Sequence, residues 1–151
     1  MLKALRQELK KAESNLNHVQ AMKNAIEIAE RFAQALDSED YESAQELLSE
    51  ACEYSCRGQS HVGPTAIIAS YKGNGDTADS KFDSVDYESS VSDMPDGTAL
   101  ITFVDHFALK GKSHTFRCEQ VLEVDNNGQI TRIVHRDLPG QREALTEFMG
   151  V

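Results

Sequence analysis

Three closely spaced strand-like segments between residues 98 and 138 constrain the fold more than any other feature of the chain. In each segment β-branched and aromatic residues alternate with polar residues, a pattern typical of half-buried β-strands. Two short segments, 110–112 and 125–128, separate the strands and contain residues that tolerate positive φ angles. The pattern therefore predicts three consecutive antiparallel strands in one sheet.

The alternation also predicts which side chains share a face of this sheet. In the middle strand one face carries His114, Phe116, Cys118, Gln120, Leu122 and Val124. The preceding strand has an apolar face that consists of Ile101, Phe103, Asp105, Phe107 and Leu109. Asp105 is the exception on that face, and burying a carboxylate is costly unless it is paired, hydrated or hydrogen-bonded. Asp105 is therefore the first candidate functional residue, unless a β-bulge turns His106 inward in its place.

The last of the three strands allows two assignments. Either Ile130, Val134 and Leu138 face the core, or Ile133, His135 and Asp137 do. Periodicity alone leaves both open.

Apolar residues in the segment 2–36 recur mostly at steps of three and four, which predicts helix. Ser14, Asn15 and Asn17 are weak helix formers and good caps. They predict a division into an N-terminal helical arm, residues 1–16, and a single α+β domain, residues 17–151. Two interpretations of the arm remain open: it contacts a partner helix or a second copy, or it is a frayed extension.

The remaining segments complete the order of elements. We expect a short helix at 41–48, a strand at 52–56 and a loop at 57–61. A third helix is expected from Thr65 to about Tyr71, opened by Gly63 and Pro64 and ended or loosened by the glycines of 73–76. An irregular strand at 82–91 and a closing helix at 141–149 follow. This order, in which helices are followed by a run of antiparallel strands, predicts the α+β class.

Composition excludes several classes of function. The chain has 151 residues and a net charge of -10, which argues against a nucleic-acid groove or an anionic membrane surface as partner. It has neither an apolar run of roughly 18 residues nor the apolar core of a secretory signal.

Cys52 and Cys56 would lie about 13 Å apart on one strand, too far for a disulfide, so the three thiols indicate a reducing, cytoplasmic location. They also lack metal-site spacing with histidines, and we expect no metal or other cofactor.

Four segments together resemble a known superfamily. They are a helix at 25–36, a strand that contains Tyr54, the segment HVGPTAII at 61–68, and the segment DNNGQITRIVHRD at 125–137. Over about residues 20–149 the chain resembles the nuclear-transport-factor-2-like (cystatin-like cone) superfamily, in its SnoaL-like and ketosteroid isomerase-like branch. The resemblance implies a strongly curved antiparallel sheet that forms a cone around a long N-terminal helix and two shorter helices, with an internal pocket.

The resemblance also implies which residues face that pocket. They are Ile101, Phe103, Asp105, Phe107, Phe116, Cys118, Gln120, Ile133, His135 and Asp137, and this choice resolves the ambiguity in the last strand. His61 lies in the loop expected over the pocket mouth. The implied partners are a small apolar molecule and a second copy of the chain in a homodimer.

Some family positions are not retained. Tyr54 and Gln120 stand where ketosteroid isomerases keep an aspartate base and an oxyanion-holding acid, so that isomerase chemistry is not expected. Asp105 matches one of the two water-holding aspartates of the epoxide hydrolases. His135 stands at the position of the other aspartate, and Phe103 stands near the position of their arginine.

These residues suggest a catalytic hypothesis. Asp105 and His135 would lie on strands about 10 Å apart, and curvature of the sheet would bring their side chains to hydrogen-bonding distance. A histidine oriented by a carboxylate is an effective general base near neutral pH. Tyr54 would supply an acidic hydroxyl, and Gln120 a donor to a developing oxyanion.

The expected chemistry is proton transfer or water activation on a small apolar compound, of the isomerase, hydrolase, dehydratase or cyclase kind. In the alternative interpretation the domain is a non-catalytic ligand-binding or dimerisation module, and Asp105 and His135 form a purely structural pair. An open pocket in which Asp105 and His135 converge on a bound ligand favours the first interpretation, and a closed cone filled by side chains favours the second.

Overall fold

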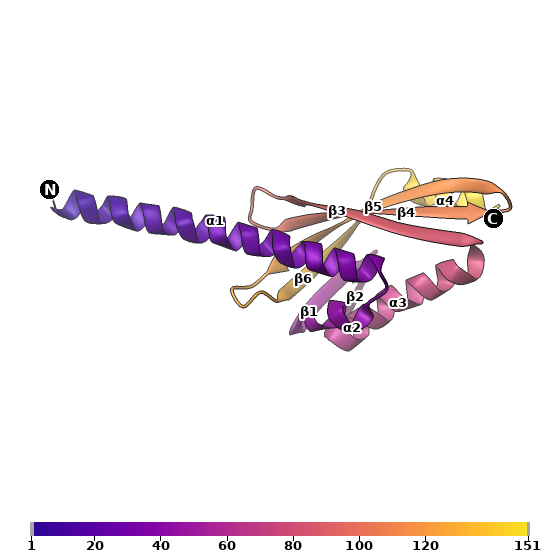
Figure 1. Ribbon diagram of the computed structural model, residues 1–151, viewed down its shortest axis with the longest axis horizontal. Helices are drawn as coiled ribbons and strands as arrows, with labels where there is room; N and C mark the ends of the chain where they lie inside the picture. The colour runs from indigo at the N-terminus through magenta and orange to yellow at the C-terminus, as the bar shows by residue number, and fades with distance from the viewer. Residues whose placement is uncertain (1, 151) are drawn as a thin grey trace.

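Six strands form one curved sheet in the order β2-β1-β6-β5-β4-β3 (Figure 1). The computed structural model describes residues 2–150, apart from the side chains of residues 18 and 22. The elements are α1 (Leu2–Asp37), α2 (Tyr41–Glu46), β1 (Leu48–Cys56), β2 (Gln59–Val62), α3 (Pro64–Lys81), β3 (Ser84–Asp93), β4 (Ala99–Leu109), β5 (Lys112–Val124), β6 (Ile130–Asp137) and α4 (Gln141–Met149). β3 to β6 pair antiparallel in succession, whereas β1 pairs parallel with β6. The predicted α+β class and the predicted run of antiparallel strands are confirmed.

The register keeps Asp105 on the concave face of the sheet. β4 pairs with β3 and β5 without a register shift, so Asp105 lies between Tyr87 on one side and Phe116 on the other. On the opposite face, the ring of His106 contacts Glu88 and Thr115 at 3.1 Å each. There is therefore no bulge that exchanges Asp105 with His106.

The hydrophobic core lies between the C-terminal half of α1 and the concave face of the sheet. Phe32 and Ala29 of α1 are fully buried, and so are Leu122 of β5 and Ile133 of β6. Burying one large apolar side chain in this way stabilises a fold by about 1.5–3 kcal/mol. These contacts fix the helix against the sheet.

A β-bulge resolves the ambiguity in β6. The register between β5 and β6 shifts between Glu123 and Val124, and both Ile130 and Ile133 are fully buried. His135 then follows Ile133 on the same face of the strand. Neither of the two assignments drawn from periodicity holds over the whole strand, because the bulge interrupts the alternation.

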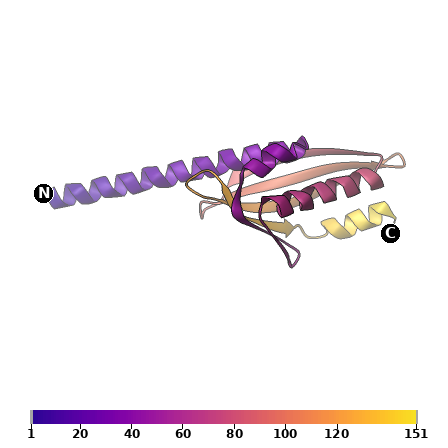
Figure 2. The same cartoon turned by 90° about the horizontal axis from the view of Figure 1, so that it is seen from below.

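The helix α1 runs unbroken through Ser14, Asn15 and Asn17, where a division was expected. Figures 1 and 2 both show its N-terminal half projecting beyond the rest of the molecule. The described side chains from residue 2 to residue 23 are all exposed, and Ala25 is the first buried residue. The backbone shows no break at these residues, and the division into arm and domain stays a prediction.

Two other expectations are corrected. The loop expected at 57–61 is a tight turn at Arg57 and Gly58, with φ angles of 49° and 79°, followed by the strand β2. Two consecutive positive φ angles are the geometry of a hairpin turn, which is why a strand forms here. The helix α3 continues through Gly73 and Gly75 to Lys81 instead of ending near Tyr71. The glycines lower the helix propensity of this segment without ending the helix, because tertiary contacts outweigh intrinsic propensity.

Among the described residues, none of the helices combines the length and the apolar character that crossing a membrane requires.

Two glycine substitutions with opposite expected effects test the backbone of α3. Gly73 lies inside the helix, and a Cβ added there would have no heavy atom within 4 Å, so Gly73→Ala should raise the free energy of unfolding by about 0.5–1 kcal/mol. Gly63 has φ 92° and ψ 154°, a conformation that only glycine adopts readily, so Gly63→Ala should lower it by about 1–3 kcal/mol. Urea unfolding of both variants measures the difference. A destabilising Gly73→Ala would contradict the long α3.

Candidate functional site

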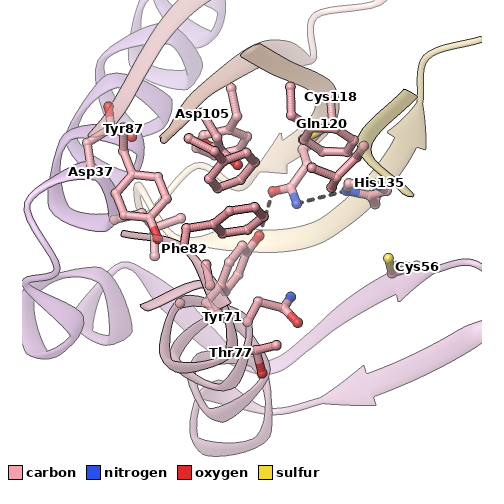
Figure 3. A pocket seen from close by; sticks show the side chains of 18 of the residues that line it. Asp37, Cys56, Tyr71, Thr77, Phe82, Tyr87, Asp105, Cys118, Gln120 and His135 are labelled. Atoms are coloured by element: carbon pink, nitrogen blue, oxygen red, sulfur yellow. Dashed lines mark hydrogen bonds between the residues drawn. The ribbon is translucent and has the colours of Figure 1, made fainter. Parts of the chain in front are cut away.

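A cavity of about 340 Å³ lies between the concave face of the sheet, the C-terminal end of α1, α3 and α4. Its volume falls within the range of about 300–1,000 Å³ that small-molecule sites occupy. The apolar part of its wall consists of Leu36, Ala78, Phe82, Phe103, Phe107, Phe116, Leu145 and Met149. Four of the polar side chains lie in two groups, with Asp37 and Tyr87 at one end and Gln120 and His135 at the other (Figure 3).

Most of the predicted site residues line this cavity. They are Tyr54, Phe103, Asp105, Phe107, Phe116, Cys118, Gln120 and His135. Three others lie elsewhere: Ile133 is in the core, Asp137 is at the end of β6, and the ring of His61 stacks on that of Tyr54 with centroids 5.9 Å apart. A role for these three residues in binding stays a prediction.

Asp105 is the most perturbed acid in the cavity. Among the described residues, none donates a hydrogen bond to its carboxylate. Burial raises the pKa of Asp105 to about 6, repulsion from the Asp37 carboxylate acts in the same direction, and His106 opposes the shift. A carboxylic acid with this pKa can both accept and release a proton near neutral pH.

Two side chains beside Asp105 complete the first polar group. Asp37 ends α1 and accepts a hydrogen bond from the hydroxyl of Ser89. Burial raises the pKa of Asp37 in spite of that bond. Tyr87, the cross-strand neighbour of Asp105, has a buried hydroxyl without a hydrogen-bond partner among the described residues. Burial and the Asp105 charge raise the pKa of Tyr87, so its hydroxyl stays protonated and is free to donate to a ligand.

Gln120 organises the second polar group and is only 3% exposed. The Tyr71 hydroxyl donates to its Oε1 at 2.5 Å, which fixes the orientation of the amide. Its Nε2 then donates to the hydroxyl of Tyr54 at 3.3 Å and to Nδ1 of His135 at 3.2 Å. The carbonyl and both N–H groups of this buried amide are therefore used inside the protein.

The bond from Gln120 decides which nitrogen of His135 carries the proton. Because Nδ1 accepts, Nε2 carries hydrogen and donates to Oδ1 of Asp137 at 3.0 Å. Arg57 donates twice to the same carboxylate, from Nε and from one terminal nitrogen, at 2.7 Å each. Arg57 first, and then His135, lower the pKa of Asp137 to about 2.

The structure does not bring Asp105 and His135 together. Asp105 lies opposite Phe116 and His135 lies opposite Gln120, so the two residues are offset by four positions along the strands. Four residues span about 13 Å, in addition to about 10 Å across two strands. The expected pairing took only the distance across the sheet into account. His135 instead uses both ring nitrogens for bonds to Gln120 and Asp137.

Sequence reasoning missed several polar residues of the site, among them Asp37, Arg57, Tyr71 and Tyr87. Asp37 resembles an ordinary helix end, and Tyr71 lies where the third helix was expected to stop. Tyr87 carried the best available signal, because it belongs to the apolar alternation of its strand. The partners of these residues come from distant segments, which no local pattern reveals.

Metal-ligating side chains do not cluster in the part of the chain that the structure describes. No three His, Cys, Asp or Glu side chains there converge as metal ligands. The three cysteines are free. Burial raises the pKa of Cys118 to about 12 and that of Cys52 to about 11, so both remain thiols near neutral pH.

Comparison with known proteins supports the fold. No protein-family model matches the chain, and no curated protein matches it by sequence. Solved structures do match. A candidate polyketide cyclase from Xanthomonas campestris superimposes with a TM-score of 0.63 at 16% identity, over 86% of this chain and 97% of that one.

Two further solved structures match the chain as well. TerC, co-crystallised with polyporic acid, gives a TM-score of 0.63 at 13% identity, over 85% of this chain and 99% of its own. An LEH-like epoxide hydrolase from M. tuberculosis gives 0.58 at 19% identity, over 85% and 98%. The chain therefore shares the fold of these proteins, a curved sheet packed around helices, as the sequence resemblance implied.

The raised pKa of Asp105 makes stability depend on pH. Between about pH 4 and pH 6 the unfolded chain releases this proton while the folded chain keeps it, so stability falls as pH rises through this range. Asp105→Asn should remove this fall and raise the free energy of unfolding at pH 7 by about 2 kcal/mol. Urea unfolding of wild type and variant from pH 4 to pH 8 measures it. If the free energies of unfolding of wild type and variant differ by the same amount at every pH in this range, the pKa of Asp105 is not raised.

Asp137 should behave in the opposite way. Its pKa is lowered to about 2, so its contribution is present above about pH 4 and is lost as pH falls toward 2. Asp137→Asn should lower the free energy of unfolding at pH 7 by about 0.5–1 kcal/mol, a modest value because Arg57 and Asp137 are partly exposed. The deficit should shrink on acidification in the same series of urea experiments. A deficit that grows at low pH would contradict the ion pair.

Proposed function

We propose that this protein binds a small, largely apolar carbonyl compound and transfers a proton to or from it through Asp105. The single observation that carries the proposal is an unpartnered carboxylic acid, with a pKa of about 6, in an aromatic-walled cavity. Such a group has the pKa of a general acid or base at neutral pH.

The neighbours of Asp105 support a specific arrangement. A ligand oxygen that accepts a hydrogen bond from the free hydroxyl of Tyr87 would lie beside Asp105, its cross-strand neighbour. Asp105 would then take a proton from the adjacent carbon. The electron pair of that C–H bond would move toward the oxygen, where the Tyr87 hydroxyl stabilises the developing charge. The phenyl rings of Phe103, Phe107 and Phe116 would hold the apolar part of the ligand.

A second function stays open, and one observation favours it. Both ring nitrogens of His135 are engaged in bonds inside the protein, so the histidine that the sequence nominated as general base is not free to act. A purely ligand-binding domain would keep the same cavity and use Gln120, Tyr54 and His135 only to maintain its shape. Catalytic roles for His135 and Tyr54 remain predictions.

We extend the proposal to the cellular location of the protein and to its oligomeric state. The three free cysteines support a reducing compartment, and we assign the protein to the cytoplasm. We also propose that it is a homodimer. Leu2, Leu5, Leu9 and Leu16, which are 55–73% exposed in the single chain, support a partner on α1.

Hydrogen–deuterium exchange into a ketone tests the catalytic proposal. With 2-tetralone in D₂O, we expect the wild-type protein to accelerate exchange of the α-hydrogens, and Asp105→Asn to reduce this acceleration at least about 100-fold. Tyr87→Phe should reduce it as well. The matched control is Asp86→Asn, on the exposed face of the neighbouring strand, which should leave exchange unchanged.

Binding measured on the same variants separates the two functions. Isothermal titration with 2-tetralone and with polyporic acid, the compound in the TerC crystals, should give saturable binding to wild type and to Asp105→Asn. Binding without accelerated exchange would reject proton transfer and favour the ligand-binding module. If neither compound binds to the wild-type protein, the proposed ligand class is wrong.

A further inference from the structure

The exposed half of α1 carries a regular apolar stripe that the domain itself does not cover. Its members lie alternately three and four residues apart, the spacing of a coiled-coil seam: Leu2, Leu5, Leu9, Ala12, Leu16 and Val19. The five large members are 47–73% exposed. We call these six residues the arm stripe. Three heptads of such spacing are typical of a helix that packs along another helix.

The arm stripe is not a continuation of the core-facing side of α1. Leu16 precedes the first buried residue, Ala25, by nine positions, which at 3.6 residues per turn is two and a half turns. The arm stripe and the buried stripe therefore lie on opposite sides of the helix. The arm stripe faces away from the body of the protein, where another helix has access to it.

A projecting helix of this length also lacks a source of stability in the single chain. Helices in proteins are held mainly by packing of an apolar face, and isolated helices of this size are marginal in water. The described residues provide no packing for the segment before residue 24. A second helix along the arm stripe would supply it.

We infer that the arm stripes of two copies of this chain pack together as an antiparallel helix pair. This inference specifies the surface of the proposed homodimer and does not depend on the ligand. The pairing places Leu2 against Val19 of the second copy, Leu5 against Leu16, and Leu9 against Ala12. The two-fold axis passes between residues 10 and 11.

Packing favours the antiparallel direction. In a parallel pair each residue of the arm stripe faces the same residue of the second copy. Ala12 then faces Ala12, which leaves a gap between the two helices. In the antiparallel pair each Ala12 faces a Leu9, so a large side chain fills the space beside a small one.

Charge favours the same direction. The residues that flank the seam include Arg6, Glu8 and Glu13. A parallel pair brings Glu8 next to Glu13 of the second copy, which is repulsive. The antiparallel pair brings Arg6 next to Glu13 instead, twice in each dimer.

Sedimentation equilibrium of the full chain tests the surface. Wild type should sediment with twice the mass of one chain. Leu5→Lys with Leu16→Lys, which sets lysines against each other, should raise the dissociation constant about 100-fold or more. The matched control is Gln7→Lys with Ser14→Lys, at positions on the same helix that point away from the seam, and it should remain dimeric. Circular dichroism checks that both variants keep the fold.

Charge variants test the direction. Glu13→Arg should weaken the antiparallel dimer about fivefold, because the introduced arginine then faces Arg6 of the second copy, whereas it would strengthen a parallel dimer. Arg6→Glu combined with Glu13→Arg should restore the wild-type constant. A monomeric wild type would overturn both the dimer and this surface. A dimer that survives the double lysine variant would overturn only the surface, and a tighter Glu13→Arg dimer would overturn the antiparallel direction.

Discussion

The buried amide of Gln120 holds together the segments that shape the cavity. Its three hydrogen bonds connect β5 to Tyr71 of α3, Tyr54 of β1 and His135 of β6. These segments are far apart in the chain, and a buried amide with any of these partners removed would carry an unsatisfied polar group. The network therefore couples the position of α3 to the curvature of the sheet.

The two ends of the cavity have different physical tasks. At the end near β6, Arg57, Asp137, His135 and Gln120 form a chain of bonds in which every member has a partner. Such a chain favours rigidity. At the end near β3, Asp105 and Tyr87 lack partners among the described residues, and burial keeps the acid partly protonated near neutral pH. Chemistry that involves a ligand is expected where the protein has left hydrogen-bonding capacity unused.

Some residues of the cavity were predicted from the sequence, and others were not. Phe103, Asp105, Phe107, Phe116, Cys118 and Gln120 were placed on one concave face by alternation and by family resemblance, and all six line the cavity. The Asp105–His135 pair was wrong, because alternation tells which face a residue occupies but not how far along the sheet it lies. That offset is set by the register between β4, β5 and β6, which includes the bulge at the start of β6. Tyr87, Asp37 and Tyr71 come from other segments, and their proximity is a tertiary fact.

The sequence by itself determined the class of the fold, the run of antiparallel strands, the closing helix and the apolar stripe along the first helix. These depend on local periodicity and turn residues, which are properties of neighbouring positions in the chain. Only the tertiary structure decided that α3 continues through its glycines, that β2 forms, and that His135 bonds Gln120 and Asp137. Each of these depends on contacts between segments distant in sequence, which local propensity cannot specify.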